Sequence, residues 1–210
     1  MPQPNDPKNG RQYLANGEFR IEKRADGDSE GRMIVGYASL FNTVAEIGGF
    51  REQVAPGAFS ETIGAGDDVR ALIDHDASRV LGRSRADTLR LSEDDKGLRI
   101  EIDLPDTQTA RDLTVSMKRG DITQMSIGFY TRKEEWDQTD PDHPLRTITQ
   151  AELFDVSVVT FPAFEETEAQ VRSREQRFEQ HKKSTNFSNA ARRLRMKAHQ
   201  DLRSRGLRTV

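Results

Sequence analysis

Apolar and polar residues alternate without a break from residue 97 to residue 104. A period of two places the apolar side chains on one face, so this segment predicts a half-buried β-strand. Residues 88–91 repeat the pattern and are expected to pair with it across a turn-rich segment. Mostly apolar runs bounded by Gly, Pro or Asp predict further strands at 33–41, 69–75, 122–130 and 153–161.

Two segments have helical rather than strand character. Pro56 opens a short predicted helix that stops at Gly64, and Pro105 precedes a second one that ends at Gly120. The second helix carries its apolar residues on one face: Ala110, Leu113 and Met117. Many strands with few helices predict a mainly β (α+β) fold, in the form of a β-barrel with helices packed outside it.

Charge and apolar spacing both change near residue 164. Residues 165–210 hold twelve Lys/Arg against six Asp/Glu, and the whole chain holds 32 against 35, which leaves 20 against 29 in residues 1–164. The apolar residues of the basic segment are isolated from one another. We therefore expect a disordered N-terminus over 1–17, a compact domain over 18–164 and a basic helical or disordered tail over 165–210.

Composition narrows the classes of protein. Charged residues make up 32% of the chain and the mean hydropathy is -0.79, and no run approaches the roughly 18 apolar residues of a membrane-spanning helix. Residues 1–6 lack an apolar stretch after basic residues, so no secretory signal peptide is expected. The absence of cysteine excludes disulfides, a thiol nucleophile and thiolate metal sites, and suits a reducing compartment.

His75 is the first residue with candidate chemistry. On the expected strand 69–75, period two places it on the same face as Val69, Ala71 and Ile73, which should be buried. Two interpretations of His75 fit a buried position: a core histidine held by one hydrogen bond, and a general base. Both need a neutral imidazole near pH 7. The sequence around it lacks a second histidine at ligand spacing, so no metal site is expected. The chain also shows no coenzyme fingerprint, so no cofactor is expected.

Ser126 lies inside the expected strand 122–130, where a serine is usually packed or bonded to a neighbouring carbonyl. Gly128 is two residues along the same face, and we expect its missing side chain to leave space for a substrate carbonyl. The arrangement is not the strand-to-helix elbow of the α/β-hydrolases. Ser126 can therefore be interpreted either as a nucleophile or as a structural serine, and both interpretations remain open at this point.

Asp155 has apolar neighbours on both faces of the expected strand 153–161. An ionised carboxylate there is costly without a partner. An imidazole N–H is one such partner, and the carboxylate would fix the tautomer of the histidine. The alternatives are a structural acid bonded to backbone amides or to an arginine, and Glu152 as the carboxylate that orients the histidine instead.

Five short motifs follow one another between residues 30 and 165. They are Gly36-Tyr37-Ala38 with Phe41; Pro56-Gly57-Ala58-Phe59; Asp74-His75-Asp76 with Leu81-Gly82-Arg83; Met125-Ser126-Ile127-Gly128-Phe129; and Asp155-Val156-Ser157 with Phe161-Pro162-Ala163. In this order they resemble the prohead proteases of tailed bacteriophages, a family related in fold to the herpesvirus assemblins. The resemblance implies an assemblin-like β-barrel surrounded by helices.

The resemblance also implies a function and its residues. His75 matches the family's histidine and Ser126 its serine, while the third member is Asp155, at a position where many members carry Glu, or else Glu152. The implied activity is that of a serine endopeptidase inside the immature capsid, in the host cytoplasm. It would remove scaffolding segments from the major capsid protein precursor and cleave itself. A homo-oligomer is compatible with this function. Neither a membrane nor a nucleic acid is an expected partner.

Two other classes of protein stay open. The chain could be a non-catalytic scaffolding or assembly protein that has the same fold. The basic tail suggests nucleic-acid binding, but its aromatic residues are only Phe178 and Phe187, and the acidic domain would repel phosphate.

Overall fold

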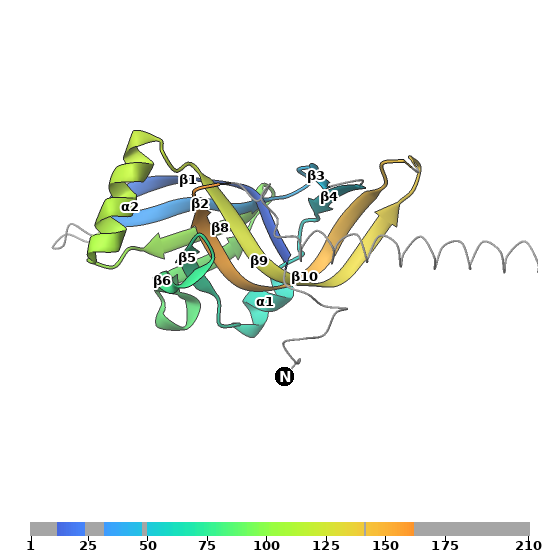
Figure 1. The fold of residues 1–210 in the computed structure, drawn as a ribbon. Helices are drawn as coiled ribbons and strands as arrows, with labels where there is room; N and C mark the ends of the chain where they lie inside the picture. Colours follow the sequence, from blue (N-terminus) through green and yellow to red (C-terminus); the bar gives the residue numbers. More distant parts are fainter. Residues whose placement is uncertain (1–11, 24–31, 48–49, 141, 162–210) are drawn as a thin grey trace, which may run out of the picture. The chain divides into compact units, whose positions relative to one another are not determined.

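The computed structural model describes residues 12–23, 32–47, 50–140 and 142–161. Strands account for most of these residues (Figure 1). The strands are β1 (Gln12–Lys23), β2 (Arg32–Leu40), β3 (Ala45–Ile47), β4 (Phe50–Val54), β5 (Arg70–Ile73), β6 (Asp76–Arg83), β7 (Leu89–Glu93), β8 (Gly97–Asp103), β9 (Gln124–Asp137) and β10 (Leu145–Val159). The helices are α1 (Ser60–Ala65), α2 (Gln108–Arg119) and the 3-10 turn η1 (Ser84–Ala86).

The strands form one sheet in the order β3-β4-β10-β9-β1-β2-β8-β7. The long strand β10 runs parallel to β4 over its first residues and parallel to β5 over its last, and β6 pairs with β5. Within the described ranges, β3 and β7 at the two ends do not pair with each other. The mainly β class with peripheral helices is thus confirmed, and closure into a barrel stays a prediction.

The first strand was not expected from the sequence. β1 begins at Gln12, so the boundary of a disordered N-terminus at residue 17 is wrong. A bulge between Leu14 and Gly17 interrupts its pairing with β9, and the Asn16 amide bonds both the N–H and the carbonyl of Leu40. The bulge and the polar residues hide the strand's alternation. Residues 1–11 and the expected tail at 165–210 lie outside the described residues.

The helices follow their local signals, but α1 differs from the prediction at both ends, and it begins at Ser60 rather than at Pro56. α2 begins after Thr107, whose hydroxyl accepts a hydrogen bond from the Ala110 N–H at 3.3 Å, and it ends at Gly120 with φ of 82°. Its apolar face is buried as expected. α1 ends at Gly66, with φ of 65°, rather than at Gly64, because only Gly66 adopts the left-handed conformation that closes the helix.

A buried ionic cluster joins four strands beside the apolar core. The side chain of Arg146 on β10 is 1% exposed and pairs with the fully buried Glu52 on β4. It also donates to Glu134 on β9 at 2.6 Å, to Thr131 at 2.8 Å and to Gln12 on β1 at 3.2 Å. These contacts tie the four strands together. They are costly to break, because removing one partner of a buried ion pair leaves the other charge uncompensated.

We expect Arg146→Met to lower the free energy of unfolding by about 3–5 kcal/mol, because it removes the positive charge that pairs with the buried Glu52 carboxylate. Arg20→Met is the matched control. The Arg20 side chain is 69% exposed, and its pair with Glu22 should contribute no more than about 1 kcal/mol. Urea denaturation of both variants measures the difference, and equal losses would contradict it.

Candidate active site

His75 lies in a hairpin turn and not in the strand that the sequence predicts. β5 ends at Ile73, which pairs directly with Asp76, so Asp74 and His75 are the two connecting residues. Their φ values are 51° and 57°, as a type I′ turn requires of both central residues. For histidine this conformation is uncommon and costs roughly 1–2 kcal/mol. The left-handed turn ends the alternation that would have placed His75 beside Ile73 in the core.

The turn brings the imidazole between a serine and a carboxylate. His75 Nε2 lies 2.8 Å from Ser126 Oγ on β9, and Nδ1 lies 2.6 Å from Asp155 Oδ1 on β10. The side chains of His75 and Asp155 are 18% and 4% exposed, and Ser126 is fully buried. Both distances are within the reach that a serine, its base and the orienting carboxylate need.

A second serine supports the carboxylate. The hydroxyl of Ser157 donates to Asp155 Oδ1 at 2.7 Å, and Ser157 is fully buried directly opposite Ser126 in the β9–β10 pair. Sequence reasoning assigned Ser157 no role. The only signal for it was its place in the Asp155-Val156-Ser157 motif, because period two puts residues 155 and 157 on one face.

Gly128 makes space for the acid rather than for a substrate. A methyl group at this position would overlap Asp155 Oδ2 and would lie 2.6 Å from the ring of Phe154. The expectation that Gly128 clears space for a substrate carbonyl is therefore wrong. Asp155 lies directly opposite Gly128 in the β-pair, and the missing side chain lets its carboxylate reach the imidazole.

Tyr13 is a further residue at the site that the sequence did not indicate. Its ring centroid lies 4.2 Å from that of His75, with the ring planes tilted by 54°. The β1–β9 register sets Tyr13 opposite Gly128, on the face that carries the serine. The contact could not be foreseen, because the strand that carries Tyr13 was itself not expected.

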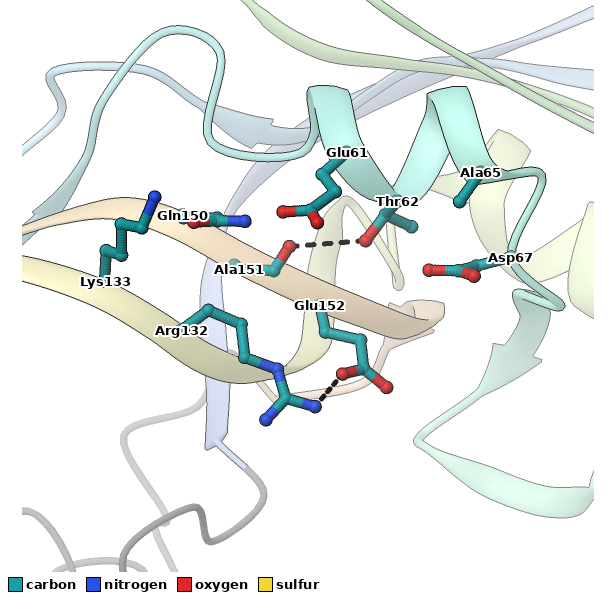
Figure 2. A pocket seen from close by; sticks show the side chains of 9 residues that line it. All are labelled: Glu61, Thr62, Ala65, Asp67, Arg132, Lys133, Gln150, Ala151 and Glu152. Carbon is teal, nitrogen blue, oxygen red and sulfur yellow. Dashed lines mark hydrogen bonds and ion pairs between the residues drawn. The ribbon is translucent and has the colours of Figure 1, made fainter. Parts of the chain in front are cut away.

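Glu152 lies in a different environment from Asp155. Its carboxylate pairs with Arg132 and lines a cavity of about 460 Å³ beside α1 (Figure 2). Thr62 on α1 donates to the Ala151 carbonyl at 3.3 Å and accepts from the Leu153 N–H at 3.1 Å, which holds α1 over this part of β10. His75 Nδ1 bonds Asp155, so the structure brings Asp155 and not Glu152 to the imidazole.

The two carboxylates beside His75 in the chain are engaged elsewhere. Asp76 accepts from the hydroxyl and the N–H of Ser78, and these bonds lower the pKa of the Asp76 carboxyl below its usual value. Asp74 accepts from the Thr160 N–H at 2.7 Å. In the part of the chain that the structure describes, no group of three His, Asp or Glu side chains is placed to hold a metal ion.

The far end of the hairpin is fixed by the Leu81-Gly82-Arg83 motif. Arg83 makes a two-pronged ion pair with Asp68 at 2.7 Å for each bond, and this pairing lowers the pKa of the Asp68 carboxyl to about 2. A methyl group on Gly82 would lie 2.7 Å from the Thr88 carbonyl oxygen. The hairpin that carries His75 is therefore anchored at its base as well as at its tip.

A serine, a histidine and a carboxylate joined in this order form the arrangement that serine hydrolases use for acyl transfer. The chain belongs to the family of caudovirus prohead serine proteases, whose family model matches residues 19–184. The family resemblance of the five motifs is thereby confirmed. No helix within the described ranges has the length and apolar character needed to cross a membrane.

The chain is similar to a curated phage protease and to a solved phage protease structure. The prohead protease of Enterobacteria phage HK97 is 32% identical over 146 residues, which cover 69% of this chain and 62% of that protein. The chain thus matches less than two thirds of that relative's length. The solved structure of the bacteriophage T4 capsid assembly protease matches with a TM-score of 0.49 and 10% identity, covering 71% of this chain and 96% of that one.

We expect Gly128→Ala to lower the free energy of unfolding by about 1–3 kcal/mol, because the added methyl displaces Asp155 or Phe154. Gly64→Ala is the matched control. Gly64 lies in α1 with nothing within 4 Å of the added methyl, so alanine there should be neutral or slightly stabilising. Thermal and urea denaturation compare the two, and a neutral Gly128→Ala would contradict the crowding.

Proposed function

We propose that this protein is a prohead maturation endopeptidase with Ser126 as nucleophile, His75 as general base and Asp155 as the residue that orients the base. The observation that carries the proposal is the continuous chain of hydrogen bonds from Ser126 through His75 to Asp155. Membership of the prohead serine protease family supports it independently.

The geometry supports acyl transfer in two halves. Ser126 Oγ attacks the scissile carbonyl carbon while His75 Nε2 takes the hydroxyl proton, and the Asp155 carboxylate stabilises the imidazolium through Nδ1–H. His75 then gives that proton to the leaving amine as the peptide C–N bond breaks. Water hydrolyses the acyl-enzyme with His75 again acting as base, which regenerates the Ser126 hydroxyl.

The family and the name of the HK97 relative support a role for this peptidase in the maturation of the phage capsid. The proposed substrate is the scaffolding segment of the major capsid protein precursor, cleaved inside the immature capsid in the host cytoplasm. Self-cleavage, a homo-oligomeric state and a closed assemblin-like barrel belong to the same proposal.

A non-catalytic assembly protein is the second candidate, and one observation favours it. Ser126 is fully buried, so a substrate carbonyl reaches Oγ only if the residues that cover it move. In the proteolytic interpretation, this arrangement is a closed state of the enzyme that opens when the substrate binds.

The first test is Ser126→Ala in the full chain, co-expressed with the capsid protein precursor and followed by mass spectrometry. We expect wild type to shorten both the precursor and itself, and Ser126→Ala to leave both intact with an unchanged melting temperature. Ser78→Ala, at an exposed serine that bonds Asp76 near the same hairpin, should process normally. A wild-type chain that cleaves neither protein would instead favour the assembly protein.

The second test separates the two carboxylates. Asp155→Asn should lower kcat on the capsid precursor by about 10³–10⁴-fold, because an amide can hold the wrong tautomer of His75. Glu152→Gln weakens a partly exposed ion pair with Arg132 and should leave kcat within about threefold. A larger loss in Glu152→Gln would move the orienting role to Glu152.

A further inference from the structure

We infer that Asp74 is a positioning residue for His75, because it ties the turn that carries the imidazole to the end of β10. The inference rests on the proposed function, in which His75 is the general base. Asp74 immediately precedes His75 and shares its left-handed backbone conformation. It bonds β10 and the residue that follows it through three hydrogen bonds.

Both the backbone and the side chain of Asp74 take part. The Asp74 N–H donates to the Val158 carbonyl at 2.9 Å, which continues the parallel pairing of β5 with β10 by one residue. The carboxylate accepts from the Thr160 N–H at 2.7 Å and from the Thr160 hydroxyl at 3.2 Å. Arg79 Nη1 lies 3.5 Å from the same carboxylate. We call the bonds from Asp74 to Val158 and Thr160 the Asp74 clamp.

The Asp74 clamp matters because β10 also carries the acid that His75 contacts. Asp155 is three residues before Val158 on one continuous strand, so the clamp and the acid are held in one rigid frame. A two-residue turn has few internal contacts to fix its tip, and the base must stay within hydrogen-bond reach of two partners. A displacement of about 1 Å is enough to cost on the order of 100-fold in rate.

The chain offers variants that separate the clamp from the turn and from the charge. Asp74→Gly suits positive φ, so it preserves the turn and the backbone bond to Val158, but it loses the two carboxylate bonds of the clamp to Thr160. Asp74→Asn keeps an oxygen that accepts from the Thr160 N–H and also tolerates positive φ, but it carries no charge. Asp76→Ala is the control, because Asp76 flanks His75 on the other side and its carboxylate accepts from the N–H and the hydroxyl of Ser78.

The experiment measures kcat and KM of the full chain on the capsid protein precursor. We expect Asp74→Gly to lower kcat about 10- to 100-fold, since the imidazole of His75 is displaced. KM should stay within about twofold, since the substitution leaves the residues that bind the substrate unchanged. Asp74→Asn should stay within about threefold of wild type, as should Asp76→Ala. The inference would be overturned if Asp74→Gly kept the wild-type kcat or changed only KM. It would also be overturned if Asp74→Asn were as slow as Asp74→Gly.

A second readout does not require activity. In the Ser126→Ala background, the proton on His75 Nδ1 that bonds Asp155 should give a downfield proton resonance. Adding Asp74→Gly should broaden or abolish it, while adding Asp74→Asn or Asp76→Ala should keep it. An unchanged resonance with Asp74→Gly would overturn the clamp. If wild type cleaves nothing but the resonance responds as expected, the proposed function fails and the positioning of His75 by Asp74 stands.

Discussion

The register between β9 and β10 is the constraint on which the site depends. Leu153 pairs with Phe129, but Asp155 pairs with Gly128, so Phe154 is an extra residue that shifts the pairing by one. Without this bulge Asp155 would lie opposite Ile127, whose side chain is in the core. A shift of one residue moves a side chain to the other face of a sheet, and here it moves Asp155 to the face of Ser126.

Several features of the fold make room for this register and fix the two strands in it. Gly128 supplies the space that the Asp155 carboxylate and the Phe154 ring require. Ser157, fully buried two pairs further along β10, bonds the Asp155 carboxylate from the same strand. The far halves of β9 and β10 are held by the buried Arg146 cluster, which also includes Gln12 at the start of β1. The two strands are thus fixed on both sides of the bulge.

The proposed general base, His75, lies outside the β9–β10 pair. His75 is on a two-residue hairpin turn between β5 and β6, and β5 joins the frame by pairing with the last residues of β10. The Tyr13 ring, one residue after Gln12 in β1, packs on the imidazole. Ser126 is fully buried, so under the proposed function a peptide reaches its hydroxyl only after motion around this contact.

The sequence by itself determined the features that depend on local periodicity and on short motifs. Alternation at 97–104 and the apolar face of α2 predicted elements that the structure contains, and the motif order pointed to Ser126, His75 and an acid in the last strand. The tertiary structure alone placed Asp155 rather than Glu152 beside the imidazole, gave Gly128 its role and put His75 in a left-handed turn. The physical reason is that a bulge, a turn and a close approach are set by strands distant in the sequence, whereas hydrophobic periodicity reports only on a residue's immediate neighbours.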